Sequence, residues 1–152
     1  MTYDFSEQPE IRKRYPLWIP TGQSNGELLV AFDNRPSKEL ARRYVIQAKR
    51  IVRIDTIVAF NGPAKDWDND GKLEYSGIQD FGEVWDDKQG HRRTAYNPVL
   101  YYEIRSTGLV LDSSLTERKA RAEFGVFQGF HYAESPGVLL SRLPKNSRRR
   151  QH

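Results

Sequence analysis

The stretch SKELARRYVIQAKRIVRIDTIVAF, residues 37–60, decides the fold that the sequence predicts. Its first part, residues 37–50, repeats apolar side chains every four positions at Leu40, Tyr44 and Ala48. This spacing indicates an amphipathic helix with one buried stripe. The rest of the stretch is apolar at both sets of alternating positions, which is typical of a strand buried on both faces. A helix followed almost without a break by a central strand is therefore expected.

The segments on either side of this stretch add more strands than helices. An Asn-Gly pair before it predicts a hairpin, and a second helix is predicted at residues 113–124, where Ser114 and Glu117 stand at capping-box spacing. Strands are expected at residues 14–20, 26–32, 72–81, 82–87, 91–96, 98–106 and 138–143. The predicted fold is α+β, a mainly antiparallel sheet with two helices packed on one side. It forms a single domain of residues 1–144 with a basic C-terminal arm, residues 145–152.

The overall composition limits the class of protein. The chain has 152 residues, enough for one domain whose core needs no metal or disulfide to fold. It has no cysteine, which excludes disulfides, thiol catalysis and cysteine-ligated zinc. No apolar run approaches the roughly 18 residues of a membrane span, and the first residues lack the apolar core of a signal peptide. We therefore expect no membrane partner, and a location in the cytoplasm or inside a viral particle.

Charge is distributed unevenly along the chain. The net charge is +4, residues 35–53 carry a net +6, residues 66–87 a net −7, and the tail after Pro144 a net +4. A basic surface and a cationic tail favour contact with nucleic acid or with an acidic protein surface. Basic and acidic regions on one chain also favour self-association. The residues predicted to make basic contacts are Lys38, Arg42, Arg43, Lys49 and Arg50 on the predicted helix, and Lys145, Arg148, Arg149 and Arg150 in the tail.

These charges make a non-enzymatic binding or assembly protein the leading hypothesis, for example a structural component of a virus or phage particle. Two alternatives stay open. In the first, the charged regions are solvated faces without a partner, which is the common outcome for charge runs. In the second, the basic and acidic regions pair with each other. The sequence does not distinguish pairing within one chain from pairing between chains.

The stretch DWDNDGKLE, residues 66–74, resembles calcium-binding DxDxDG loops. In such loops carboxylates at positions one, three and five and a carbonyl at seven surround the cation, and a bidentate glutamate at twelve closes the site. The candidate ligands are Asp66, Asp68, Asp70, the Lys72 carbonyl and Glu74. Position twelve is Gly77, which offers no ligand, so Glu83 or Asp80 would have to complete a Ca²⁺ or Mg²⁺ site. The alternative is an exposed hairpin turn at Asp70-Gly71.

A third hypothesis is a metal-dependent nuclease or phosphodiesterase. Asp86 or Asp87, followed on a later strand by Glu103 and Arg105, resembles an arrangement in which two carboxylates hold Mg²⁺ and a lysine helps to activate water. Here arginine replaces the lysine, and arginine does not give up its proton. The alternative is that Glu103 and Arg105 pair with neighbours on a solvated strand face. No P-loop, nucleophile-elbow or histidine metal motif is present, which favours a binding protein over an enzyme.

Overall fold

The computed structural model describes residues 14–144, in which ten strands form three antiparallel sheets. The strand orders are β1-β2-β3-β4, β5-β8-β9 and β10-β7-β6. The bounds are β1 Leu17–Gly22, β2 Asn25–Phe32, β3 Leu40–Gln47, β4 Arg50–Val58, β5 Glu74–Gly77, β6 Val84–Asp86, β7 Arg92–Tyr96, β8 Leu100–Arg105, β9 Gly108–Leu111, α2 Ser113–Phe124, β10 Ala133–Leu139 and the 3₁₀ turn η2 Leu140–Arg142.

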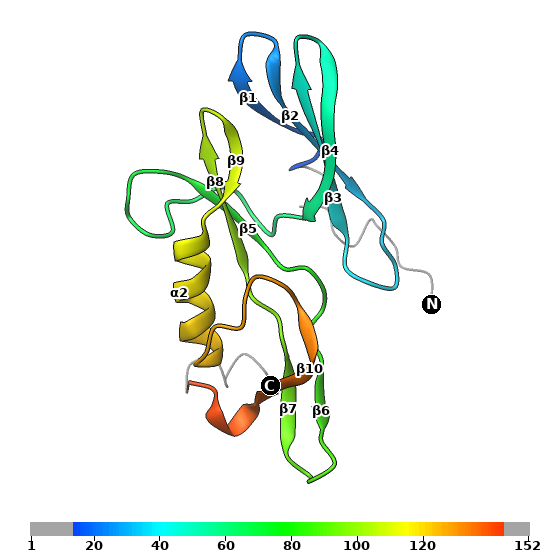
Figure 1. The fold of residues 1–152 in the computed structure, drawn as a ribbon, viewed down its shortest axis with the longest axis vertical. Helices are drawn as coiled ribbons and strands as arrows, with labels where there is room; N and C mark the ends of the chain where they lie inside the picture. Colours follow the sequence, from blue (N-terminus) through cyan, green and yellow to red (C-terminus); the bar gives the residue numbers. More distant parts are fainter. Residues whose placement is uncertain (1–13, 145–152) are drawn as a thin grey trace.

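The sheets follow one another along the longest axis of the molecule. Figure 1 shows the β1–β4 sheet at one end, the sheet of β6, β7 and β10 at the other, and β5, β8 and β9 between them. Helix α2 lies beside β8 in this central region. The long loop between β4 and β5 lies near the first turn of α2, so the centre of the molecule brings together segments from distant parts of the chain.

The predicted α+β fold, with two helices packed on one side of a sheet, is wrong. The structure is mostly β, with 47% of residues in strands and 12% helical, and α2 is the one helix of seven or more residues within residues 14–144. No helix in this part of the chain is long and apolar enough to cross a membrane. The predicted C-terminal arm, residues 145–152, lies outside the described residues.

The predicted helix at residues 37–50 is wrong because this segment forms β3 and the turn that leads into β4. A spacing of four is a multiple of the strand period of two, so Leu40 and Tyr44 share a strand face as readily as a helix face. The turn consists of Ala48 and Lys49, whose φ angles of 51° and 63° lie in the left-handed region. Such turns favour Asn and Gly, so neither residue indicated a hairpin in the sequence.

Two other local predictions are confirmed. β1 and β2 pair as the expected hairpin, but the turn lies at Gln23 and Ser24, and Asn25 and Gly26, on which the prediction rested, belong to β2. Helix α2 occupies residues 113–124 and ends at Gly125, whose φ of 76° suits a residue without a side chain. Its N-cap, however, is Asp112 rather than Ser114, because the Asp112 carboxylate accepts a hydrogen bond from the Leu115 amide at 3.1 Å.

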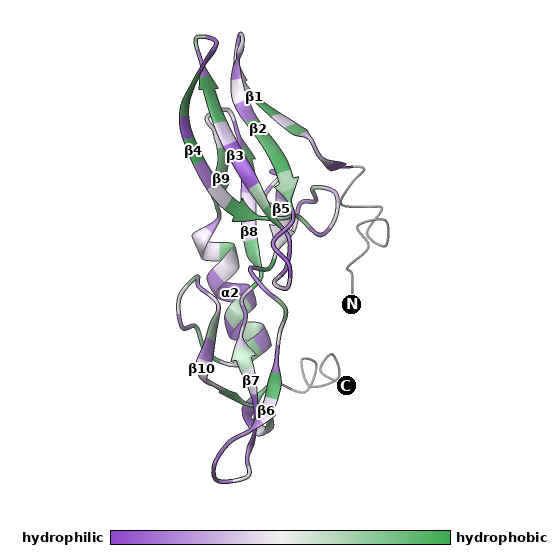
Figure 2. Cartoon of the chain, turned by 90° about the vertical axis from the view of Figure 1, so that its right-hand side faces the viewer, coloured by the Kyte–Doolittle hydropathy of each residue, from purple (hydrophilic) through white to green (hydrophobic). Residues whose placement is uncertain are grey.

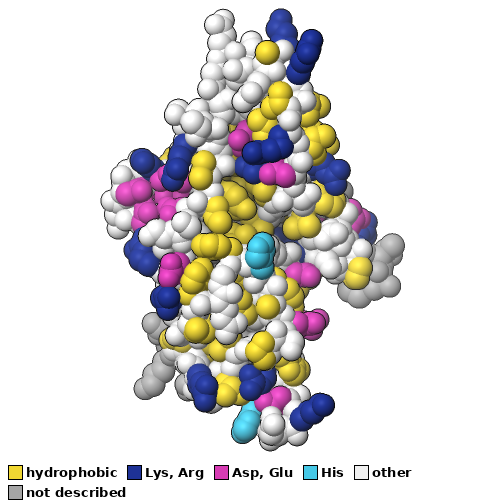
Figure 3. Space-filling view, in the orientation of Figure 1, with side chains coloured by type: hydrophobic (Ala, Val, Ile, Leu, Met, Phe, Trp, Pro, Cys, Tyr) yellow, Lys and Arg dark blue, Asp and Glu magenta, His cyan; other side chains and the backbone are white. Residues whose placement is uncertain are grey.

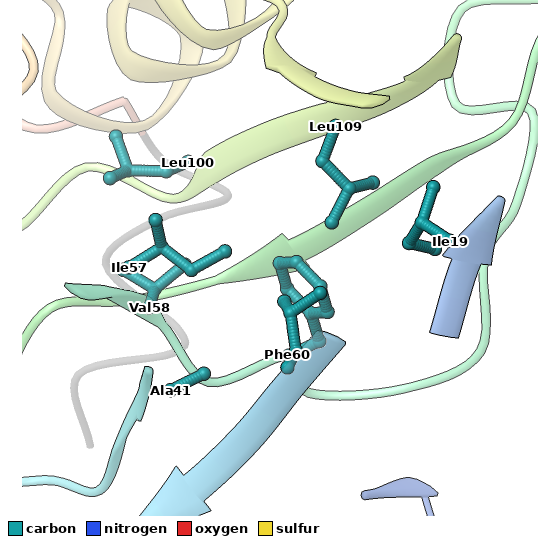
Figure 4. Packing of buried hydrophobic residues seen from close by; sticks show 8 residues of the cluster. Ile19, Ala41, Ile57, Val58, Phe60, Leu100 and Leu109 are labelled. Atoms are coloured by element: carbon teal, nitrogen blue, oxygen red, sulfur yellow. The ribbon is translucent and has the colours of Figure 1, made fainter. Parts of the chain in front are cut away.

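Two clusters of buried apolar side chains hold these elements together. The larger cluster joins the β1–β4 sheet to β8 and β9 (Figure 4), and its members are Ile19, Leu29, Ala41, Ile57, Val58, Phe60, Leu100 and Leu109. The smaller cluster packs α2 against β7 and β10, through Tyr96, Phe124, Val138 and Leu143. Phe60 stacks on Tyr75 with ring centroids 4.6 Å apart. This stack fixes both ends of the loop between β4 and β5, which carries the acidic residues.

Candidate metal-binding site

The loop between β4 and β5 carries three of the four carboxylates predicted as cation ligands, and the Lys72 carbonyl. Asp66, Asp68 and Asp70 lie on this loop, and Glu74 is the first residue of β5. Two backbone hydrogen bonds between Lys65 and Glu74, at 3.0 and 2.7 Å, close the loop at its base. In Figure 3, acidic side chains gather at the left edge of the molecule, where Figure 1 places this loop.

The loop is curled by hydrogen bonds from its own backbone amides to its carboxylates. Asp66 accepts hydrogen bonds from the amides of Asp70 and Gly71, at 3.1 and 2.8 Å. Asp70 accepts one from the Lys72 amide at 2.9 Å. Because these bonds span at most five residues, the local sequence is sufficient to bring the carboxylates together.

One oxygen of Glu74 is buried without a hydrogen-bond partner. The residue is 0% exposed, and its Oε2 accepts a hydrogen bond from the Trp67 amide at 3.0 Å. Its Oε1 has no partner within residues 14–144, and neither does the buried Oδ1 of Asp68. Burying a charged carboxylate oxygen without a donor is unfavourable, so a proton, a water or a cation at these oxygens would stabilise the site.

Glu74 belongs to a group of four converging carboxylates. One oxygen from each residue of the group lies within 4.8 Å of the others, and the group is Asp66, Asp68, Asp70 and Glu74. Among the described residues one ion pair reaches the group, from Arg118 Nη2 on α2 to Asp68 Oδ2 at 4.0 Å. The Arg118 side chain is 63% exposed, so this pair neutralises little of the negative charge.

Two further carboxylates adjoin Glu74 from other parts of the fold. Glu103 on β8 is directly opposite Glu74 in the β5–β8 pairing and is 3% exposed. Asp112, the N-cap of α2, completes a second group with Glu74 and Glu103 whose ligand oxygens also lie within 4.8 Å of one another. Arg105 forms an ion pair with Glu103 from the same strand. Like charges directly opposite on paired strands repel, so this pair also favours a bridging cation or a proton.

The pKa of Glu74 is raised to about 7. Burial is the main cause, and the charges of Asp68, Asp70 and Asp112 raise it further, whereas the Trp67 amide lowers it. Burial, followed by contact with Asp70, also raises the pKa of Asp68. Because the pKa of Glu74 lies near neutral pH, a proton and a cation can compete for this carboxylate.

With a chelator present, the free energy of unfolding is expected to fall as the pH rises from about 5 to about 8. The folded-state pKa of Glu74, about 7, exceeds its ordinary value of 4.5, so the stabilising contribution is complete below pH 4.5 and is lost as the pH rises through 7. Carboxyl groups with lowered pKa, such as Asp55, titrate below this range. Urea unfolding at a series of pH values measures the slope, which Glu74→Gln should flatten. An unchanged slope in that variant would contradict the assignment.

The two acidic groups could hold a metal ion. Carboxylate oxygens are ligands that hard cations such as Ca²⁺ and Mg²⁺ prefer. At position twelve of the calcium-loop pattern, a Cβ on Gly77 would lie 2.3 Å from the Ala59 carbonyl oxygen, so no glutamate fits there. The fold brings Glu103 and Asp112 to Glu74 instead.

The other predicted completing residues lie away from the loop carboxylates. Asp80 accepts a hydrogen bond from the Lys38 amide at 3.2 Å, and the pKa of Glu83 is raised by its neighbour Glu134. The sequence pattern does not indicate Asp112 as a ligand, and it places Glu103 in the predicted nuclease site. No local pattern could have indicated either residue, because both reach Glu74 only through strand pairing and the placement of α2.

The basic residues of segment 37–50 do not share one surface. Lys38 and Arg43 are buried, at 6% and 8% exposure, whereas Arg42, Lys49 and Arg50 are exposed. Neighbouring residues of a strand point to opposite faces, which separates Arg42 from Arg43. The basic residues predicted in the tail, Lys145, Arg148, Arg149 and Arg150, lie outside the described residues, and contact with nucleic acid stays a prediction.

The carboxylates of the nuclease hypothesis are not brought together. Asp86 is the last residue of β6 and Asp87 follows it, whereas Glu103 lies on β8 in another sheet. Asp86 pairs with Arg92 at 3.3 Å, and Asp87 pairs with Arg93 at 2.8 Å. Within the described part of the chain, Glu103 instead belongs to the group that contains Glu74.

Comparison of the chain with models of protein families, with curated proteins and with solved structures found no match. The role of the acidic site must therefore be inferred from its own geometry.

Proposed function

We propose that this chain is a calcium-binding protein whose cation lies between the acidic β4–β5 loop and Glu74. The observation that supports this most directly is the fully buried Glu74 carboxylate, which has an unpartnered Oε1 and belongs to a group of four converging carboxylates. A divalent cation would satisfy that oxygen and the unpartnered Oδ1 of Asp68. It would also offset the repulsion among the carboxylates.

The ligand set favours Ca²⁺ over Mg²⁺. Calcium accepts six to eight oxygen ligands in flexible geometry, whereas magnesium requires a near-ideal octahedron and retains several waters. The four carboxylates and the Lys72 carbonyl together offer enough oxygen atoms for calcium without a glutamate at position twelve. Both oxygens of Asp66 already accept amide hydrogen bonds, but each carboxylate oxygen has a second lone pair for a cation.

A cation at this site would join elements that are far apart in the sequence. The loop supplies three of its carboxylates and β5 supplies Glu74. Through Glu74 the cation would also lie next to β8 and the first turn of α2, which carry Glu103 and Asp112. Binding energy that depends on the folded arrangement contributes to folding stability, so the expected role of the ion is structural.

Isothermal titration calorimetry on the chelator-treated full chain tests the proposal. We expect saturable binding of Ca²⁺ and weaker binding of Mg²⁺. Glu74→Gln and Asp68→Asn each preserve the shape of a side chain and remove a ligand charge, so each should weaken calcium binding by at least about tenfold.

Asp86→Asn is the matched control for these variants. Asp86 is exposed on β6 and pairs with Arg92, so the same loss of charge outside the acidic groups should leave calcium affinity unchanged. Far-ultraviolet circular dichroism should show that all three variants retain the wild-type strand content. No saturable heat with the wild type, or full affinity in both ligand variants, would reject the proposed function.

A further inference from the structure

Strand β4 has an outer edge that no described strand covers. It is the last strand of the β1-β2-β3-β4 sheet, so the prediction of a central strand buried on both faces is wrong, and within residues 14–144 it pairs only with β3. An uncovered edge presents free backbone donors and acceptors that can pair with another strand. Proteins commonly protect such edges with proline, and the opposite edge strand, β1, contains Pro20. β4 contains no proline, and its pairing with β3 is regular from Arg53 to Val58, with one register irregularity between Ile51 and Arg53.

The same strand exposes three large apolar side chains. Ile51, Val52 and Ile54 are 57%, 54% and 53% exposed. Figure 2 shows β4 along the margin of the first sheet with apolar and polar residues alternating along it. An apolar row continues across the outer face of the sheet, because Ile54 is opposite Tyr44 on β3, which is in turn opposite Leu28 on β2. Contiguous exposed apolar surface of this kind marks an interaction site.

The charges on β4 select a second copy of the same strand as the partner. In the sequence Arg53-Ile54-Asp55, opposite charges flank one apolar residue. In an antiparallel pairing centred on Ile54, Arg53 of each copy lies opposite Asp55 of the partner subunit, and the two Ile54 side chains meet. A centre at Arg53 or at Asp55 would place like charges directly opposite each other, which is destabilising.

Both charged residues are available for this contact. Arg53 is exposed and forms no ion pair within 4.0 Å in residues 14–144, although its charge already lowers the pKa of Asp55 in the same chain. Asp55 pairs with Arg43, but its side chain is still 35% exposed. A contact in which the same patch meets itself across a two-fold axis closes after two copies, and therefore yields a dimer rather than a fibre.

We infer that β4 is the interface of a two-fold symmetric homodimer, in which the β4 strands of two copies pair antiparallel about Ile54 and extend the β1–β4 sheet across both subunits. The inference is independent of the calcium site, since no residue of the two acidic groups lies on β4.

A single cysteine tests both the partner and the register, because the chain has no cysteine of its own. Residues directly opposite in an antiparallel pair have Cα atoms about 4.5–5.5 Å apart, within the roughly 4.4–6.8 Å that a disulfide spans. Ile54→Cys should therefore form a covalent dimer under mild oxidation. Thr56→Cys is the matched control on the same strand face, since its two copies would lie roughly 13 Å apart and should not cross-link. Equal cross-linking of both variants, or none of Ile54→Cys, would overturn the inference.

Sedimentation velocity of the full-length chain, without any introduced cysteine, provides the second test. The wild type should sediment with twice the mass of one chain, and Ile54→Lys or Arg53→Asp should weaken the dimer at least tenfold by placing like charges together. Val30→Lys is the control for Ile54→Lys, because Val30 is 39% exposed on β2, away from the edge. A wild-type monomer, a dimer that resists both edge variants, or equal loss of the dimer in Val30→Lys would each overturn pairing through β4. Glu74→Gln should leave the dimer intact, which separates this result from that of the calcium experiment.

Discussion

Arg43→Ala is expected to lower the free energy of unfolding by about 3–5 kcal/mol, because it removes the buried cation of a hydrogen-bonded network. The guanidinium of Arg43 donates two hydrogen bonds to Asp55, at 2.8 and 2.6 Å, and lies 3.4 Å from Glu27 Oε1. It also donates to the Leu109 carbonyl at 3.0 Å, and the Leu109 amide donates to Glu27 at 3.1 Å. The network therefore connects the β1–β4 sheet to β9. Without Arg43, the 4% exposed Glu27 becomes a buried charge without a counterion.

Urea unfolding followed by circular dichroism measures this loss, and Arg42→Ala is its matched control. Arg42 is the preceding residue on the same strand but is exposed, with its guanidinium 5.2 Å from the centroid of the Phe32 ring. Loss of that contact should cost less than about 1 kcal/mol. Adding Glu27→Gln to Arg43→Ala should recover part of the lost stability, because the amide carries no buried charge. Equal losses in Arg42→Ala and Arg43→Ala would show that the network makes no net contribution.

Calcium at about one hundred times its dissociation constant is expected to raise the thermal unfolding midpoint by roughly 5–10 °C at pH 8. Binding to the folded state alone contributes about 2.7 kcal/mol at that concentration, and each kcal/mol raises the midpoint of a chain of this size by about 2–4 °C. The pH matters because Glu74, with a pKa raised to about 7, must lose its proton before it binds a cation. Scanning calorimetry with calcium and with a chelator measures the shift.

Two variants show whether this shift arises at the acidic site. Glu74→Gln should reduce the shift to about half or less, because an affinity weakened tenfold leaves about 1.4 of the 2.7 kcal/mol. Asp86→Asn, which lies outside the acidic groups, should retain the full shift. With the chelator at pH 8, Glu74→Gln should unfold at a higher temperature than the wild type, because it no longer buries a charge. A calcium shift of the same size in Glu74→Gln and the wild type would place the ion elsewhere.

Local interactions explain which parts of the fold the sequence predicted correctly. Helix α2 combines helix-favouring residues with a glycine that ends it, and both effects act within a few residues. The segment 37–50 has no comparable local signal, because apolar residues spaced four apart fit a helix and a strand equally. Its pairing with β2 on one side and β4 on the other provides the strand hydrogen bonds. This pairing, rather than intrinsic propensity, decides its conformation.

The candidate site likewise combines features that the local sequence predicts with features that depend on tertiary contacts. The curled loop of Asp66, Asp68 and Asp70 could be predicted from nine residues, since its hydrogen bonds are local. The burial of Glu74 and the approach of Glu103 could not be predicted, because both depend on the β5–β8 pairing.

The sequence by itself therefore determined the hairpin of β1 and β2, the helix α2 and the acidic loop, whose stabilising contacts lie within short stretches of chain. Only the tertiary structure decided that β3 is a strand, that Arg43 is buried while Arg42 is exposed, and that Glu74 has a pKa near neutrality. The physical reason is that burial, strand pairing and desolvation depend on atoms contributed by distant parts of the chain. A local sequence pattern does not indicate which distant residues will make these contacts.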